Sequence, residues 1–65
     1  MPKFIELHSA SGELAVMLRA DRIVAVTDRA IRTDVWLAGD EQPYKVAETV
    51  VEVMEKIKEA SDAEG

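Results

Sequence analysis

The stretch that decides the fold lies near the end of the chain, at residues 44–57, YKVAETVVEVMEKI. Four apolar residues recur there at the i, i+3, i+4, i+7 spacing of one helical face, namely Val50, Val53, Met54 and Ile57. Thr49 and Glu52 form a capping-box pattern, in which each side chain serves the backbone N–H of the other residue. The pattern predicts a helix from about Thr49 to about Ser61. Because three helical turns are marginal in water, this helix needs a sheet beside it.

The residues before the helix are rich in strand formers that are separated by turn formers. The predicted strands cover residues 3–8, 13–18, 22–27, 31–37 and, after Pro43, 44–46. They predict an α+β fold, with a four- to five-stranded antiparallel meander sheet and one C-terminal helix packed on one face. We expect a single domain over residues 1–65, ordered from about 3 to 60, with a frayed tail at 61–65.

Alternation along the strands predicts two apolar faces. The helix-side core is expected to comprise Ile5, Leu7, Leu14, Val16, Leu18, Ile23, Ala25, Val35, Leu37 and Val46, together with the four helix residues. Six further residues would face away from the helix: Phe4, Ala15, Met17, Val24, Val26 and Trp36. An apolar free face of an antiparallel sheet is typical of a protein contact, so these six form the predicted protein interface. In the alternative, a curled, barrel-like sheet would bury them as core.

Composition limits the classes of function. The chain has 65 residues, a formal net charge of -5 and no cysteine. A domain of this size is marginally stable alone, which favours a homo-oligomer, with a dimer preferred. Without cysteine there is no disulfide and no thiolate metal site, and no segment has the length of a membrane span, so we expect a cytoplasmic protein with no membrane contact.

Residue types suited to catalysis are sparse. His8 is the single histidine, and with Glu6 it makes a poor metal site for want of a third ligand. Its neighbours Ser9 and Ser11 do not by themselves indicate a triad, and the isolated glycines exclude a phosphate-binding loop. We therefore predict no enzyme activity, no cofactor and no metal, and a small module that binds protein, first of all itself.

A group of arginines supports a second hypothesis. Arg19, Arg22, Arg29 and Arg32 flank the third predicted strand and could contact nucleic acid or an acidic partner. In the alternative interpretation, each arginine pairs with a neighbouring aspartate at a strand end. The negative net charge speaks against nucleic acid. A third hypothesis is that the acidic helix and tail imitate nucleic acid and inhibit a protein that binds it.

The order of these motifs resembles the small FlbD-like proteins of flagellar and swarming motility. The resemblance lies in FIELH at residues 4–8, the turn at Gly12, RIVAV at 22–26 and YKVAETVVEV at 44–53. The closing strand and helix are also similar to those of DNA-binding LytTR-type domains. The resemblance implies a regulator that contacts nucleic acid, and it implies no catalytic residues.

Overall fold

The computed structural model describes residues 3–62 and contains five strands, one short 3-10 helix and one α-helix. The strands are β1 (Phe4–His8), β2 (Ala15–Arg19), β3 (Ile23–Asp28), β4 (Thr33–Leu37) and β5 (Tyr44–Val46). The 3-10 helix η1 (Ala20–Arg22) follows β2, and α1 (Val50–Asp62) closes the chain. The α+β class is confirmed. Of the predicted frayed tail, residues 61 and 62 belong to α1, and 63–65 lie outside the described residues.

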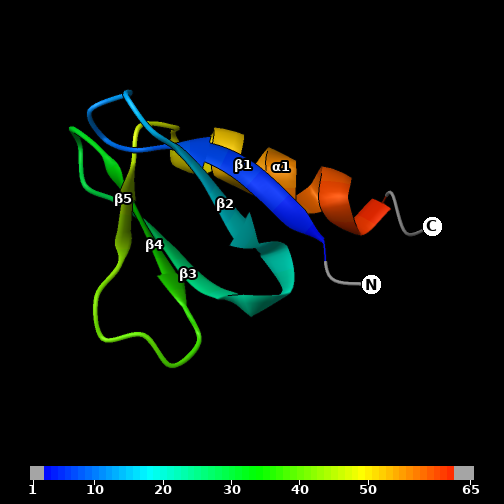
Figure 1. Cartoon of the computed structure of the whole chain (residues 1–65). Coiled ribbons are helices and arrows are strands. Elements are labelled where there is room, and N and C mark those ends of the chain that lie inside the picture. The colour runs from blue at the N-terminus through cyan, green and yellow to red at the C-terminus, as the bar shows by residue number, and fades with distance from the viewer. Residues whose placement is uncertain (1–2, 63–65) are drawn as a thin grey trace.

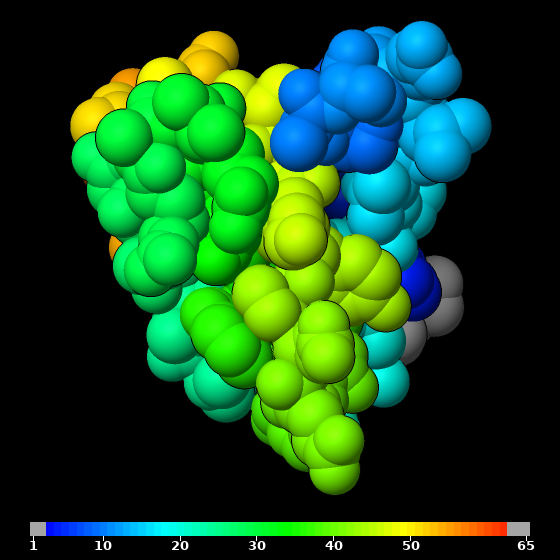
Figure 2. Space-filling model, turned by 90° about the vertical axis from the view of Figure 1, so that its left-hand side faces the viewer, coloured from blue at the N-terminus to red at the C-terminus, as the bar shows by residue number. Residues whose placement is uncertain are grey.

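The strands form two antiparallel sheets, not the single meander sheet that the sequence predicts. One sheet holds β1 and β2, and the other has the order β3-β4-β5. A bridge between Ser9 and Val46 links them, so that β5 lies between the β1–β2 loop and the β3–β4 hairpin (Figure 2). The break comes at η1, which turns the chain from the first sheet to the second within three residues. Backbone hydrogen bonds fix this corner at both ends, Ala20 to Lys3 at 2.9 Å and Ala38 to Arg22 at 2.8 Å.

The core lies where the two sheets and the helix meet. Its buried apolar residues come from every element except β3 and η1, and they are Ile5, Leu7, Leu18, Val35, Val46 and Val53. Figure 1 shows α1 running alongside β1. The helix packs against β1 and β3. One helix therefore closes a wedge between two sheets.

Three residues that the sequence assigns to the core are exposed, namely Leu14, Ala25 and Met54. Leu14 is 67% exposed because it precedes β2 at the loop end of the β1–β2 hairpin. Met54 is exposed because α1 buries a narrower stripe than predicted, in which Val53, Ile57 and Ala60 contact the core. These three assignments were wrong.

A bulge in β3 explains the error at Ala25. The register of β3 against β4 shifts between Ile23 and Ala25, so that Val24 has no partner across the ladder. A bulge inserts one residue and reverses the alternation beyond it. Ile23 and Val26 consequently both pack against the core, whereas Val24 and Ala25 between them face solvent. The prediction that Val26 faces away from the core is therefore wrong for the same reason.

The predicted capping box is confirmed. The Thr49 N–H donates to Glu52 Oε1 at 2.9 Å, and the Glu52 N–H donates to Thr49 Oγ1 at 3.1 Å. Each contact satisfies one N–H of the first helical turn that the helix itself cannot pair. Within residues 3–62, no helix is long and apolar enough to cross a membrane.

Candidate protein-binding surface

The outer face of the β1–β2 sheet carries half of the predicted interface. The register pairs Phe4 with Arg19, Glu6 with Met17 and His8 with Ala15, and these six side chains share the face that points away from the core. Phe4 is 52% and Met17 56% exposed, and Ala15 is exposed as well. The face is therefore mixed, with three apolar side chains interleaved with three polar ones.

Beside this face the surface is hollowed. A hollow of about 280 Å³ lies between the end of β2 and the neighbouring sheet. Its lining combines apolar side chains from four segments with charged residues, and comprises Phe4, Met17, Leu18, Arg19, Arg22, Leu37, Ala38, Asp40 and Tyr44. Tyr44 was missed by the sequence reasoning, because an aromatic residue after Pro43 reads equally well as part of a buried strand. Phe4, Met17 and Tyr44 thus meet at one site.

The other three predicted interface residues lie elsewhere. Val24 is exposed, but on the bulge of β3. Trp36 is half-buried on β4, where it pairs with Ala25 in the second sheet. Val26 packs against the core. The structure therefore divides the predicted face between two sheets and brings only Phe4, Ala15 and Met17 together.

The backbone of β2 is open on the side away from β1. Hydrogen bonds join Ser9 to Leu14 and Ala20 to Lys3, and both pairs continue the register of the hairpin. Since hydrogen-bonded and non-hydrogen-bonded pairs alternate in an antiparallel ladder, the paired positions on β2 are Val16 and Leu18.

The remaining positions of β2 point outward. They are Ala15, Met17 and Arg19. In the described part of the chain, the N–H and C=O groups of Ala15 and Met17 and the N–H of Arg19 find no backbone partner, whereas the C=O of Arg19 begins the 3-10 helix η1. His8 of β1 confirms the alternation, because its N–H and C=O bond to Glu48 and Ala47 instead of β2. The outer side of β2 is an unpaired sheet edge.

On the other side of the hairpin, His8 is fixed by a glutamate. The Glu48 carboxylate accepts from the His8 N–H at 2.9 Å and lies 2.7 Å from Nδ1. Burial alone would raise the pKa of Glu48, but the hydrogen bonds from the His8 ring and backbone outweigh it and hold the pKa below its ordinary value. The pair ties the end of β1 to the residue before the helix cap. Sequence reasoning missed it, since 40 residues separate the partners.

The four arginines are dispersed and engaged. Arg19 makes two hydrogen bonds to Asp21, the shorter at 2.6 Å. These hydrogen bonds are the main reason that the pKa of Asp21 lies below its ordinary value. Arg32 and Arg29 both contact the buried carboxylate of Asp34, at 3.0 and 3.6 Å.

Arg22 differs from the other three. Its Nη2 donates to the Ala38 carbonyl at 3.4 Å, and among residues 3–62 it has no carboxylate partner. Arg22 and Arg29 lie at opposite ends of β3, which places them ~20 Å apart along the strand. The arginines form two pairs at two ends of the molecule and not one basic patch.

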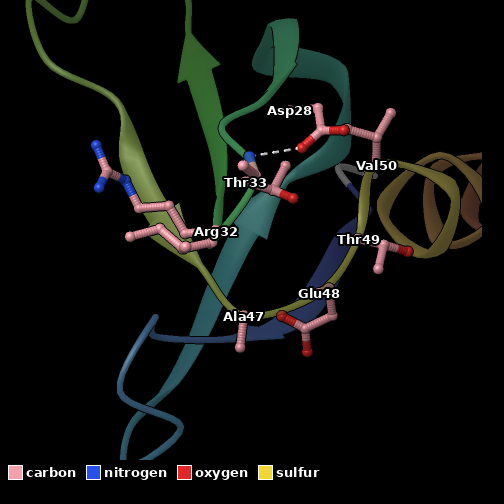
Figure 3. A pocket seen from close by; sticks show the side chains of 9 residues that line it. Asp28, Arg32, Thr33, Ala47, Glu48, Thr49 and Val50 are labelled. Carbon is pink, nitrogen blue, oxygen red and sulfur yellow. Dashed lines mark hydrogen bonds between the residues drawn. The ribbon is translucent and has the colours of Figure 1, made fainter.

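A second hollow, of about 220 Å³, lies between the β3–β4 turn and the start of α1 (Figure 3). Asp28 accepts a hydrogen bond there from the backbone N–H of Ala30 at 2.8 Å. Arg32 also borders the hollow, but its guanidinium is held by Asp34. Asp28 and Glu48 leave the lining acidic, and no set of three or more metal-ligating side chains gathers anywhere in residues 3–62.

Comparison with known proteins does not assign this geometry to a family. The surface around β2 is defined by an unpaired backbone edge, exposed Phe4 and Met17, and a hollow that Tyr44 lines. The resemblance to FlbD-like proteins stays a prediction. No family model, no curated protein and no solved structure matches this chain.

Proposed function

We propose that this chain is a non-enzymatic protein-binding module of the cytoplasm that associates first with a second copy of itself through the β1–β2 sheet. The observation that carries the proposal is the exposure of Phe4 and Met17 beside a hollow that also contains Tyr44. Large apolar and aromatic side chains that gather at one concave site are typical of protein contacts. The small size of the domain adds a reason to associate.

The arginines give less support to a nucleic-acid regulator. Three of the four are engaged by aspartates, and the two ends of β3 keep them apart. A phosphate backbone is bound by a continuous basic surface, and the chain has a net charge of -5. We therefore keep self-association as the proposed function.

Light scattering after size exclusion tests the proposal at tens of micromolar protein. We expect the mass of a dimer for the natural chain and of a monomer for Met17→Lys, because a charge on the contact side chain must lose its water on association. The matched control is Val24→Lys, an equally exposed apolar residue on the other outermost strand, which should leave the dimer intact. A natural chain that elutes as a monomer at this concentration contradicts the proposal.

A further inference from the structure

We infer that two copies join edge to edge through β2, with the two strands antiparallel across a twofold axis at Met17. The inference rests on the proposed self-association and specifies its geometry. A twofold contact must be self-complementary, so that each feature of the surface meets its counterpart when the copy is turned about the axis. The edge of β2 can be tested for this property in its backbone, its apolar side chains and its charges.

The backbone groups are complementary in one alignment above all others. When Met17 faces Met17 of the second copy, Ala15 faces Arg19, and the two five-residue strands overlap along their full length. These are the positions whose N–H and C=O groups point outward. Every unpaired group of the edge then acquires an antiparallel ladder partner, as in strand addition to other sheets. A shift by one residue would instead present the groups already bonded to β1.

The apolar side chains are complementary in the same alignment. Leu14 is 67% exposed and by alternation lies on the core side of the hairpin, together with Val16 and Leu18. In the dimer Leu14 lies diagonal to Leu18 of the second copy.

Leu18 and Arg22 both line the hollow of about 280 Å³. The exposed leucine at one end of β2 thus lies beside Leu18, at the edge of this hollow, twice in each dimer. A leucine that is exposed to water in the monomer is covered in the dimer.

The charges follow the same order. Glu13 precedes Leu14, is exposed, and has no cationic partner within residues 3–62. In the dimer Glu13 lies toward η1 of the second copy, where Arg22 likewise has no carboxylate partner among residues 3–62. A free carboxylate and a free guanidinium thus lie at the same end of the inferred contact.

A cysteine substitution at the axis tests the alignment directly, because the chain contains no cysteine. Met17→Cys places the two thiols in a hydrogen-bonded pair with Cα atoms about 5.5 Å apart, within the usual range for a disulfide. We expect mild oxidation to convert most of this variant to a covalent dimer on a non-reducing gel. The control is Ala15→Cys, whose two copies would lie four residues apart along the ladder, ~13 Å, too far to bridge.

Each outcome separates the geometry from the proposed function. A natural chain that scatters as a dimer, with no cross-link at Met17→Cys or with equal cross-linking at Ala15→Cys, overturns the β2 alignment and leaves self-association standing. A natural chain that is monomeric overturns both.

The leucine and its hollow have their own test. Leu14→Glu should raise the dimer dissociation constant at least tenfold in analytical ultracentrifugation while its circular dichroism spectrum stays native, because Leu14 contributes nothing to the core of the monomer. Ile31→Glu is the matched control, since Ile31 is 89% exposed at the tip of the other hairpin. If the dimers of the two variants are equally stable, Leu14 does not take part in the contact between the two copies.

Discussion

The outermost strands of the two sheets, β2 and β3, manage their free edges in different ways. β3 carries the bulge at Val24 and packs against α1. The edge of β2 has no bulge, no proline and no charge before Arg19, and its outward N–H groups are unpaired. Bulges, charges and covering helices are the means by which proteins prevent contact between sheet edges. Their presence on β3 and absence on β2 indicate which edge is left for a partner.

The largest effect should come from proline in β2, and its size should depend on which way the replaced N–H points. Val16→Pro removes an N–H that the ladder bonds to β1, and we expect it to lower the free energy of unfolding by about 3 kcal/mol. Met17→Pro removes an outward N–H and should cost less than ~1.5 kcal/mol while it abolishes the dimer. Urea denaturation at low protein concentration measures both, and equal costs would contradict the assignment of the open edge.

The bulge on β3 can be tested by shortening the two valines on either side of the point where the inward–outward alternation reverses. Val26→Ala removes methyl groups that pack against the core and should cost about 1.5 kcal/mol. Val24→Ala removes the same atoms from an exposed position and should cost under ~0.5 kcal/mol. Thermal or urea unfolding of the two variants compares them. A larger loss at Val24 would mean that alternation runs through β3 without a bulge.

The turn after β3 carries backbone strain, and relieving it should stabilise the protein. Ala30 has a φ of 70°, in the left-handed region that a Cβ disfavours. Ala30→Gly should raise the free energy of unfolding by about 1 kcal/mol. Ala10→Gly, in the loop of the other hairpin and without a positive φ, should give no gain because it only adds freedom to the unfolded chain. Equal responses of the two variants would show that the turn is unstrained.

The smallest expected effect is the acid sensitivity of the contact that holds β1 beside the helix. Because the pKa of Glu48 is lowered in the folded chain, its contribution to stability is present above the ordinary pKa of glutamate, about 4.3, and is lost as the pH falls through the lowered value. Glu48→Gln should therefore flatten the fall of Tm between about pH 5 and pH 3. Glu41→Gln, an exposed glutamate in the β4–β5 loop, should leave the slope unchanged.

The parts of the fold that sequence predicts are those whose signals are local. The capping box needs only Thr49 and Glu52, three residues apart, and the helix needs only its period. The turns around Gly12 and Gly39 are also predicted locally, because glycine readily adopts the positive φ that both positions have. These features specify the α+β class and most strand positions.

The features that sequence does not predict depend on residues far apart in the chain. A run of strand formers does not indicate where a bulge will form, yet the bulge at Val24 exchanges the faces of Ala25 and Val26. The pairing of His8 with Glu48 has no local pattern. The division into two sheets follows from the corner at η1, which reads in sequence as a tight turn within one sheet.

The candidate site was predicted in part for the same reason. Alternation places Phe4, Ala15 and Met17 on one face because β1 and β2 pair regularly over their full length. Alternation says nothing about which other strands end nearby, so Tyr44 was missed. It also grouped Trp36 with these three residues, although the structure has Trp36 in a second sheet. The exposure of Leu14 is the most informative disagreement, because the residue lies where the inferred dimer needs it.

The packing of β1 against α1 has a consequence for the order in which the protein is made. β1 leaves the ribosome before α1, yet Leu7 and Val53 share one core. The apolar side of the nascent β1–β2 hairpin therefore stays uncovered until α1 has been translated. Contacts between distant segments slow folding, and exposed strands in that interval are prone to aggregate. We expect translation speed and chaperone supply to affect the yield of this protein.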